Sequence, residues 1–258
     1  MSPKIDLILT APPADSRAAL RFGLPVAHMA YRAGGGPHLF RANIPVSIRG
    51  GLMAMDSVGF DGRGEADGFC SEVMRECSAR GFDGIVCDFE GRSIPLLGNI
   101  VRTLGELTAR RGWPLYVPEA YAPFSDKTRI LISSALSGGS LRQRLEDAAG
   151  QYGADRIALA VERVADDFFL PSPTGQGMPL TREELKQRME ERSPSVFFSN
   201  ELCAHYFTYM SKQNGAHFVL FDDAGSIRKK LQIARSVGVS HALLAYPQVD
   251  DLLTDILA

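Results

Sequence analysis

The chain has 258 residues, which is enough for a large core and close to the roughly 250 residues of a single α/β barrel. Its 28 basic and 30 acidic side chains are mixed along the chain and leave a net charge of −2, so no nucleic-acid partner is indicated. No run approaches the ~18 apolar residues of a membrane-spanning helix, and no membrane partner is predicted.

The first ten residues and the cysteines bear on the cellular compartment. The apolar run in residues 1–10 is too short for a signal peptide and predicts a first strand instead. The cysteines form no CxxC pair and have no histidine nearby, which favours buried, reduced thiols over a zinc site. These features predict a cytoplasmic protein without a metal ion. The cysteines are Cys70, Cys77, Cys87 and Cys203.

Strand-like and helix-like segments alternate along most of the chain. Eight β/α alternations favour a closed (β/α)8 TIM barrel of the α/β class, formed by residues 1–258 as one domain. The glycine run 34–36 lacks the lysine of a phosphate-binding loop and the dinucleotide fingerprint, so no nucleotide cofactor is predicted. The predicted strands lie near 5–10, 26–31, 51–56, 82–90, 114–119, 129–135, 156–163 and 241–246, and the predicted helices at 67–80, 94–111, 139–152 and 224–237.

The alternation is interrupted between residues 165 and 223. A loop rich in proline and glycine is followed by a helix with Thr181 as N-cap and Glu184 three residues later, which is a capping box. Two strand-like runs, 205–210 and 217–221, flank the polar turn 211–216 and predict a hairpin. We therefore expect a small α+β insertion between the seventh and eighth barrel strands, on the catalytic face.

The stretch 82–90, Phe-Asp-Gly-Ile-Val-Cys-Asp-Phe-Glu, carries the strongest functional signal. In a strand, alternate residues share a face, so Val86, Asp88 and Glu90 point one way and the apolar residues between them point the other. The acidic residues come at the carboxyl end of the strand. In a parallel barrel, catalytic groups lie at that end.

This stretch resembles the fourth-strand signature DxxDxDxE of the family 18 glycoside hydrolases, the chitinase-type barrels, at Asp83, Asp88 and Glu90. An insertion after the seventh strand is also common in that family. The loop, the hairpin and the stretch Phe221–Lys230 resemble the short bacterial members that degrade spore cortex and peptidoglycan. The resemblance covers most of the chain; it is strong for residues 69–92 and 196–246 and weak for the first 60.

The resemblance implies hydrolysis of β-1,4-linked N-acetylglucosamine polysaccharide, and peptidoglycan or spore cortex more than chitin. The acetamide group of the sugar would attack its own anomeric carbon, so the enzyme needs no nucleophile and no cofactor. Glu90 would be the general acid, and Asp88 would orient the acetamide and stabilise the developing charge. One proton shared between these carboxyls would help keep the acid protonated. The resemblance also implies association with the spore.

Other acidic and aromatic residues near predicted strand ends are candidate substrate-binding residues. On strand 156–163 the small residues Ala158 and Ala160 predict that Glu162 faces the lumen at the catalytic end. Carboxylates and rings around one pocket suit a neutral polyhydroxylated ligand. The remaining candidates are Tyr246, Glu119, Tyr121, Tyr31 and Asp56.

Three departures from the family pattern keep an alternative open. Val86 replaces an aspartate of the signature, strand 130–136 lacks the tyrosine that holds the acetamide oxygen, and Tyr246 replaces the tryptophan under the sugar. These changes favour a catalytically impaired, lectin-like barrel. A further alternative makes Glu162 a nucleophile, which requires carboxyl groups about 5 Å apart.

Overall fold

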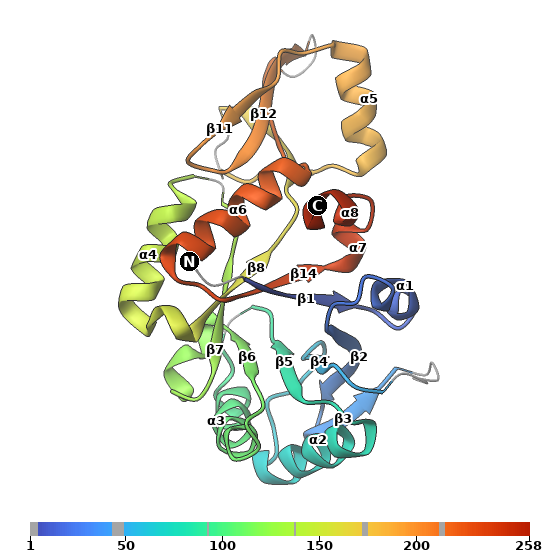
Figure 1. Cartoon of the computed structure of the whole chain (residues 1–258), viewed down its shortest axis with the longest axis vertical. Helices are drawn as coiled ribbons and strands as arrows, with labels where there is room; N and C mark the ends of the chain where they lie inside the picture. The colour runs from blue at the N-terminus through green and yellow to red at the C-terminus, as the bar shows by residue number, and fades with distance from the viewer. Residues whose placement is uncertain (1–4, 43–48, 92, 137, 172–174, 212–214) are drawn as a thin grey trace.

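The computed structural model describes residues 5–42, 49–91, 93–136, 138–171, 175–211 and 215–258. Eight parallel strands form a closed ring, because the first strand pairs with both the second and the last (Figure 1). Each overlaps a predicted strand, so the (β/α)8 barrel is confirmed. The barrel strands are β1 (Asp6–Ala11), β2 (Val26–Gly34), β4 (Leu52–Asp56), β5 (Gly84–Asp88), β6 (Leu115–Pro118), β7 (Arg129–Ser133), β8 (Ile157–Val161) and β14 (His241–Ala245).

The alternation of side chains along each strand separates the lumen from the helix layer. Val86 and Ala158 belong to a small cluster inside the barrel. Ile85, Cys87 and Phe89 pack outward in a second, larger cluster. The faces predicted for β5 and β8 are therefore confirmed, and Asp88 follows Val86 on the lumenal side.

Helices cover most of the outside of the barrel, and the four predicted ones are present. The connection between β6 and β7 is instead a short 3-10 helix, η1 (Glu119–Phe124). No described helix is long and apolar enough to cross a membrane. The α-helices around the barrel are α1 (Ser16–Leu20), α2 (Ala66–Arg80), α3 (Pro95–Ala109), α4 (Leu141–Tyr152), α6 (Ala224–Val237), α7 (Tyr246–Val249) and α8 (Leu253–Leu257).

The connection from β2 to β4 contains a strand that the sequence did not predict. β3 (His38–Arg41) pairs antiparallel with the end of β2 and extends the sheet beyond the ring. The register between β2 and β4 shifts at a bulge between Met29 and Tyr31. A bulge reverses which later residues of a strand face inward. It therefore decides which side chains of β2 reach the catalytic end of the barrel.

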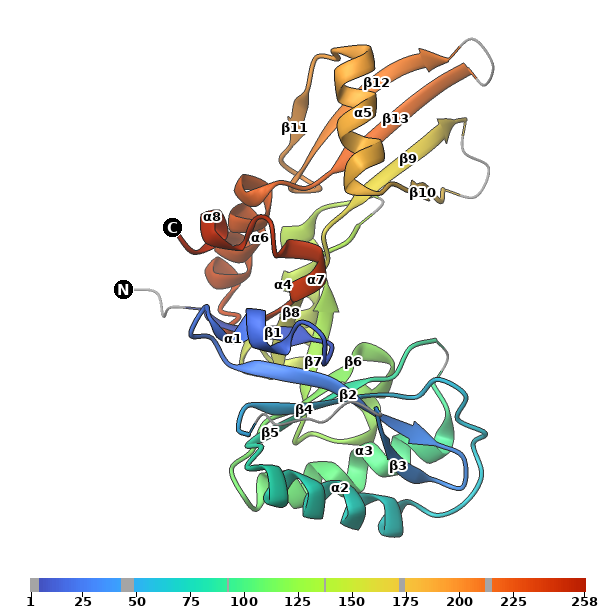
Figure 2. The same cartoon turned by 90° about the vertical axis from the view of Figure 1, so that its right-hand side faces the viewer.

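An antiparallel sheet with a single helix interrupts the barrel between β8 and β14 and projects from it (Figure 2). The predicted hairpin is present as β12 and β13, although turn residues 212–214 lie outside the described residues. The predicted α+β insertion is confirmed. In sheet order its strands are β10 (Met178–Pro179), β9 (Ala165–Leu170), β13 (Gly215–Phe221), β12 (Ala204–Ser211) and β11 (Phe197–Ser199), and its helix is α5 (Arg182–Arg192).

Helix α5 begins and packs as its sequence predicts. Thr181 and Glu184 form the capping box, each side chain bonding the backbone N–H of the other residue. Leu185 then packs against Phe207 and Val219 on one face of the sheet. The opposite face of the sheet is not covered by this helix.

A buried ion pair connects the insertion to the barrel. The side chain of Lys230 on α6 is fully buried, and its Nζ donates to Oδ2 of Asp222 at 2.6 Å. Asp222 also accepts from the Ser226 hydroxyl at 2.7 Å and from the Val164 N–H at 2.9 Å. Because these residues come from the end of the insertion, from α6 and from the segment after β8, the network holds the three segments together.

Candidate active site

Carboxylates from three different strands meet at the carboxyl end of the barrel. Asp56 and Asp88 are the last residues of β4 and β5 and are direct neighbours in the parallel register. Glu90 follows Asp88 by two residues, and Glu162 comes directly after β8. Burial raises the pKa of the half-buried Asp88, and the charges of the other three carboxylates raise it further. These four predicted residues therefore share one electrostatic environment.

A cation that the sequence analysis missed joins this group. The Arg32 guanidinium on β2 pairs with the Asp56 carboxylate through Nε at 2.6 Å and Nη2 at 3.3 Å. Simple alternation along β2 would have placed Tyr31 on the lumenal face and Arg32 outside. The bulge reverses the two. The only sequence signal for Arg32 was its place at the end of a predicted strand.

Tyr31 is consequently a core residue, and its predicted role at the rim of the site is wrong. The residue is 3% exposed, and its ring lies edge-on to Phe82 with centroids 6.0 Å apart. Its hydroxyl donates to the carboxylate of Glu76 on α2 at 3.0 Å. The side chain therefore packs between the barrel wall and α2, away from the carboxylates.

Tyr121 and Glu119 are also turned away from the lumen, which corrects their predicted roles in binding. Tyr121 is fully buried in the helix layer, where its hydroxyl accepts a hydrogen bond from the Ile94 N–H at 3.3 Å. Glu119 pairs with Arg144 and accepts a hydrogen bond from the Tyr152 hydroxyl, both on α4. Both residues belong to η1, whose tight turn directs side chains differently from an extended strand end.

Tyr246 does not provide the predicted platform under a sugar. The residue is 9% exposed, and its ring packs in the outer core with the Phe22 ring 6.2 Å away. By alternation along β14, Leu243 faces the interior and Leu244 faces outward, and Tyr246 continues the outward series. The ring is thus held in the helix layer.

Below Asp88 the lumen is apolar. Val86 lies next to Ala54 in the β4–β5 register, and both are almost completely buried. β7 carries no tyrosine and ends at Ser133. The Ser133 hydroxyl accepts a hydrogen bond from the Ala135 N–H at 3.0 Å. Ser134 instead holds the backbone of Glu162, accepting from its N–H at 3.1 Å. The polar chemistry of the site is therefore confined to the rim of the barrel.

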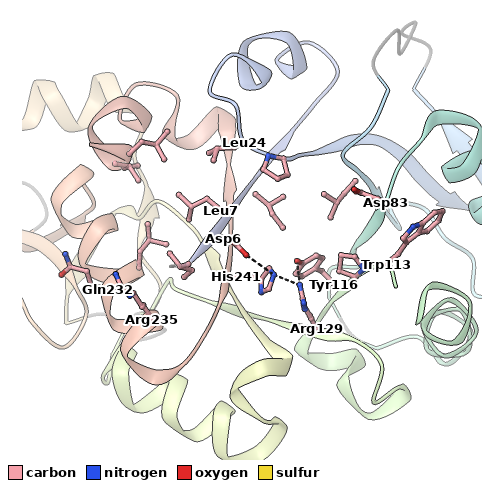
Figure 3. Close-up of a pocket in the computed structure, with 18 of the residues that line it drawn as sticks. Asp6, Leu7, Leu24, Asp83, Trp113, Tyr116, Arg129, Gln232, Arg235 and His241 are labelled. Atoms are coloured by element: carbon pink, nitrogen blue, oxygen red, sulfur yellow. Dashed lines mark hydrogen bonds and ion pairs between the residues drawn. The ribbon is translucent and has the colours of Figure 1, made fainter. Parts of the chain in front are cut away.

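A cavity of about 710 Å³ lies at the opposite, amino-terminal end of the barrel. Figure 3 shows Arg129 between the side chains of Tyr116 and His241. Its Nη1 donates to the Tyr116 hydroxyl at 3.0 Å and to Nε2 of His241 at 2.7 Å. Burial, and then the charge of Arg129, lower the pKa of His241, which favours the neutral ring. None of the predicted site residues lines this cavity.

The cysteines lie in the core of the protein. All four cysteines are buried and form no disulfide, as predicted. Burial raises the pKa of Cys70 and of Cys77 to about 12. Within the described ranges, no group of three histidine, cysteine or acidic side chains is arranged to hold a metal ion.

Comparison with known proteins identifies the fold. No protein-family model matches the chain. Among solved structures, the match to the spore cortex-lytic enzyme SleL of Bacillus cereus covers 99% of this chain and 75% of the SleL chain, with 15% identity and a TM-score of 0.69. The match to SleL of Bacillus megaterium covers 95% of this chain and 71% of that SleL chain, with 13% identity and a TM-score of 0.68. A chitinase from Chromobacterium violaceum covers 97% of both chains, with 16% identity and a TM-score of 0.70. The chain therefore has the barrel fold of these spore cortex-lytic enzymes and chitinases.

Proposed function

We propose that the protein is a glycoside hydrolase of the family 18 type that cleaves β-1,4-linked N-acetylglucosamine polysaccharide with retention of configuration. The observation that carries this proposal is the pair Asp88 and Glu90, which follow one lumenal strand face to the carboxyl end of β5 and interact electrostatically. In a parallel barrel this is the end that carries catalytic groups.

The roles of the two carboxyls follow from their surroundings. Glu90 is exposed at the rim and can donate a proton to the oxygen of the leaving sugar as the glycosidic bond breaks. The acetamide oxygen of the substrate forms the new bond to the anomeric carbon. Asp88, half-buried beside it, can accept the acetamide N–H and stabilise the positive charge. Water then opens the intermediate, with Glu90 taking the proton back.

The similar structures and the charge of the site favour a polymer of N-acetylglucosamine as substrate. The similar structures include spore cortex-lytic enzymes and chitinases, and both names refer to polymers that contain N-acetylglucosamine. Asp56 pairs with Arg32, so the rim offers both donors and acceptors to sugar hydroxyls. We assign peptidoglycan of the spore cortex as the first substrate to test, and a cytoplasmic or spore-associated location goes with that assignment.

A second candidate function is sugar binding without hydrolysis. It is favoured by the apolar pair Val86 and Ala54 directly below Asp88, because neither side chain can hydrogen-bond the carboxylate. A lectin-like protein would retain the rim and lose turnover.

The two functions are separated by incubating the protein with purified peptidoglycan and with chitin oligomers, followed by mass analysis and anomer analysis of the products. Hydrolysis that first releases the β-anomer supports the hydrolase. Glu90→Gln and Asp88→Asn should each lower the rate by roughly 10²-fold or more. Glu106→Gln, an exposed substitution on α3, is the matched control and should leave the rate unchanged. Binding without products from the parent protein would favour the second function.

A further inference from the structure

The hairpin of β2 and β3 extends the barrel wall beside the carboxylates. Arg32 and Phe40 are direct partners in its register, so both side chains lie on the same face. This face includes Arg32, which reaches the Asp56 carboxylate at the rim. Figure 2 shows this arm and the strands of the insertion extending on the same side of the barrel. The arm therefore lies at the end of the barrel that carries Asp88 and Glu90.

Phe40 is an aromatic residue whose ring packs against the backbone of the arm and is exposed to solvent. It is 54% exposed, although a large apolar residue of this kind is usually buried. Its ring lies directly over Gly34. A Cβ atom at Gly34 would lie 2.3 Å from Cε2 of the ring, so any side chain there would displace it. Gly34 does not have a left-handed φ, so its backbone conformation does not require glycine. The Phe40 ring, however, leaves no space for a side chain at residue 34, so its position requires glycine there.

A cavity connects this ring to the carboxylates. Its volume is about 230 Å³, and its lining includes Met29, Arg32, Phe40 and Asp56. Asp56 lies beside Asp88 in the sheet register, so the cavity begins next to the candidate catalytic residue. A pyranose ring has an apolar face and a rim of hydroxyls. The aromatic ring can stack on that face, and the paired guanidinium and carboxylate can hydrogen-bond the hydroxyls.

We propose that Phe40, with the Arg32–Asp56 pair, forms a sugar-binding subsite on the β2–β3 arm, which is occupied when an oligosaccharide extends beyond Asp88 and Glu90. The proposal rests on the proposed function, since it assigns a polymeric rather than a short substrate to the same site. It makes Gly34 the residue that positions the ring.

The test compares Phe40→Ala and Gly34→Ala with Phe197→Ala. Phe197 on β11 of the insertion is also 54% exposed, so it is a matched control for the loss of an exposed phenylalanine. With chitohexaose as substrate, Phe40→Ala should raise KM about fivefold, the loss of one aromatic contact. Gly34→Ala should raise it similarly by displacing the ring. Chitotriose should be affected little, and Phe197→Ala should match the parent protein with both substrates.

Binding of chitohexaose, measured by calorimetry on the same proteins, keeps the test independent of turnover. If the parent protein hydrolyses nothing, the proposed hydrolase fails, and a weaker affinity of Phe40→Ala than of Phe197→Ala still supports the subsite. Equal affinities or equal KM values for Phe40→Ala and the parent protein overturn the subsite, as does an absence of chitohexaose binding by the parent protein. Circular dichroism of each variant identifies any that fails to fold, and the other variant then decides.

Discussion

Replacing Lys230 by methionine should destabilise the whole protein, although the residue is far from the candidate catalytic carboxyls in the sequence. Both members of the Lys230–Asp222 pair have fully buried side chains, and their charged atoms are 2.6 Å apart. Methionine has a similar length and no charge. In Lys230→Met, Asp222 would keep its hydrogen bonds from Ser226 and Val164 but lose the only cation that pairs with it among the described residues.

The expected loss follows from the burial of this pair. Removing one partner of a buried ion pair leaves an uncompensated charge and costs about 3–5 kcal/mol of unfolding free energy. For a protein of this size, that corresponds to a decrease in Tm of roughly 6–20 °C. The measurement is urea unfolding followed by circular dichroism at pH 7, with Tm from a thermal scan.

Two further variants make the measurement specific. Lys229→Met changes the exposed neighbouring lysine of α6 and should leave the unfolding free energy within about 0.5 kcal/mol of the parent value. The double variant Lys230→Met with Asp222→Asn removes both charges and should be more stable than Lys230→Met alone. A loss below about 1 kcal/mol for Lys230→Met, or a double variant less stable than the single one, would refute the reasoning that the pair is desolvated.

Three other predictions concern titratable groups. Asp56→Asn removes one of the charges that raise the pKa of Asp88, so that pKa should fall, and carbon NMR of the Asp88 carboxyl during a pH titration measures the shift. The lowered pKa of His241 means that the folded state prefers the neutral ring. Its contribution to stability should be complete above about pH 6.5 and should be lost as pH falls below that value, with a shallower dependence in His241→Gln, measured by urea unfolding at several pH values. At pH 8 the native thiols should not react with a disulfide reagent, and four should react in urea, because burial raises the pKa of the cysteines.

Most of the barrel could be predicted because its strands follow one simple rule. Each strand is a short apolar run bounded by helix-like or loop-like segments, and on β8 the small residue Ala158 faces the lumen while bulky neighbours face the helices. Those runs predicted all eight strands, and alternation of side chains predicted the faces of β5 and β8. The β2–β3 arm was missed because it is built around a glycine run, which reads as a loop. Its strand pairing depends on β2 continuing beyond the barrel, which is a tertiary property.

Regular strands placed two of the candidate site residues correctly, and local departures from a regular strand account for two of the wrong predictions. Asp56 and Asp88 end regular strands, and the structure brings them together. Tyr31 was misplaced by a bulge that alternation cannot reveal, and Tyr121 by the start of a 3-10 helix. Tyr246 was misplaced for another reason, because it follows the outward-facing residues of β14 into the helix layer.

The apolar layer under Asp88 and the ion pair beside it belong to one physical arrangement. The side chains of Val86 and Ala54 offer no hydrogen bond that would stabilise a charged Asp88 from below. The carboxylates that raise its pKa lie at the rim, where Arg32 pairs with Asp56 and offsets part of the negative charge next to Asp88. Groups at the rim and a bound sugar are therefore the partners with which Asp88 can exchange protons and hydrogen bonds. A substrate acetamide would supply the partner that the lumen lacks, which makes sugar binding and the ionisation of Asp88 interdependent.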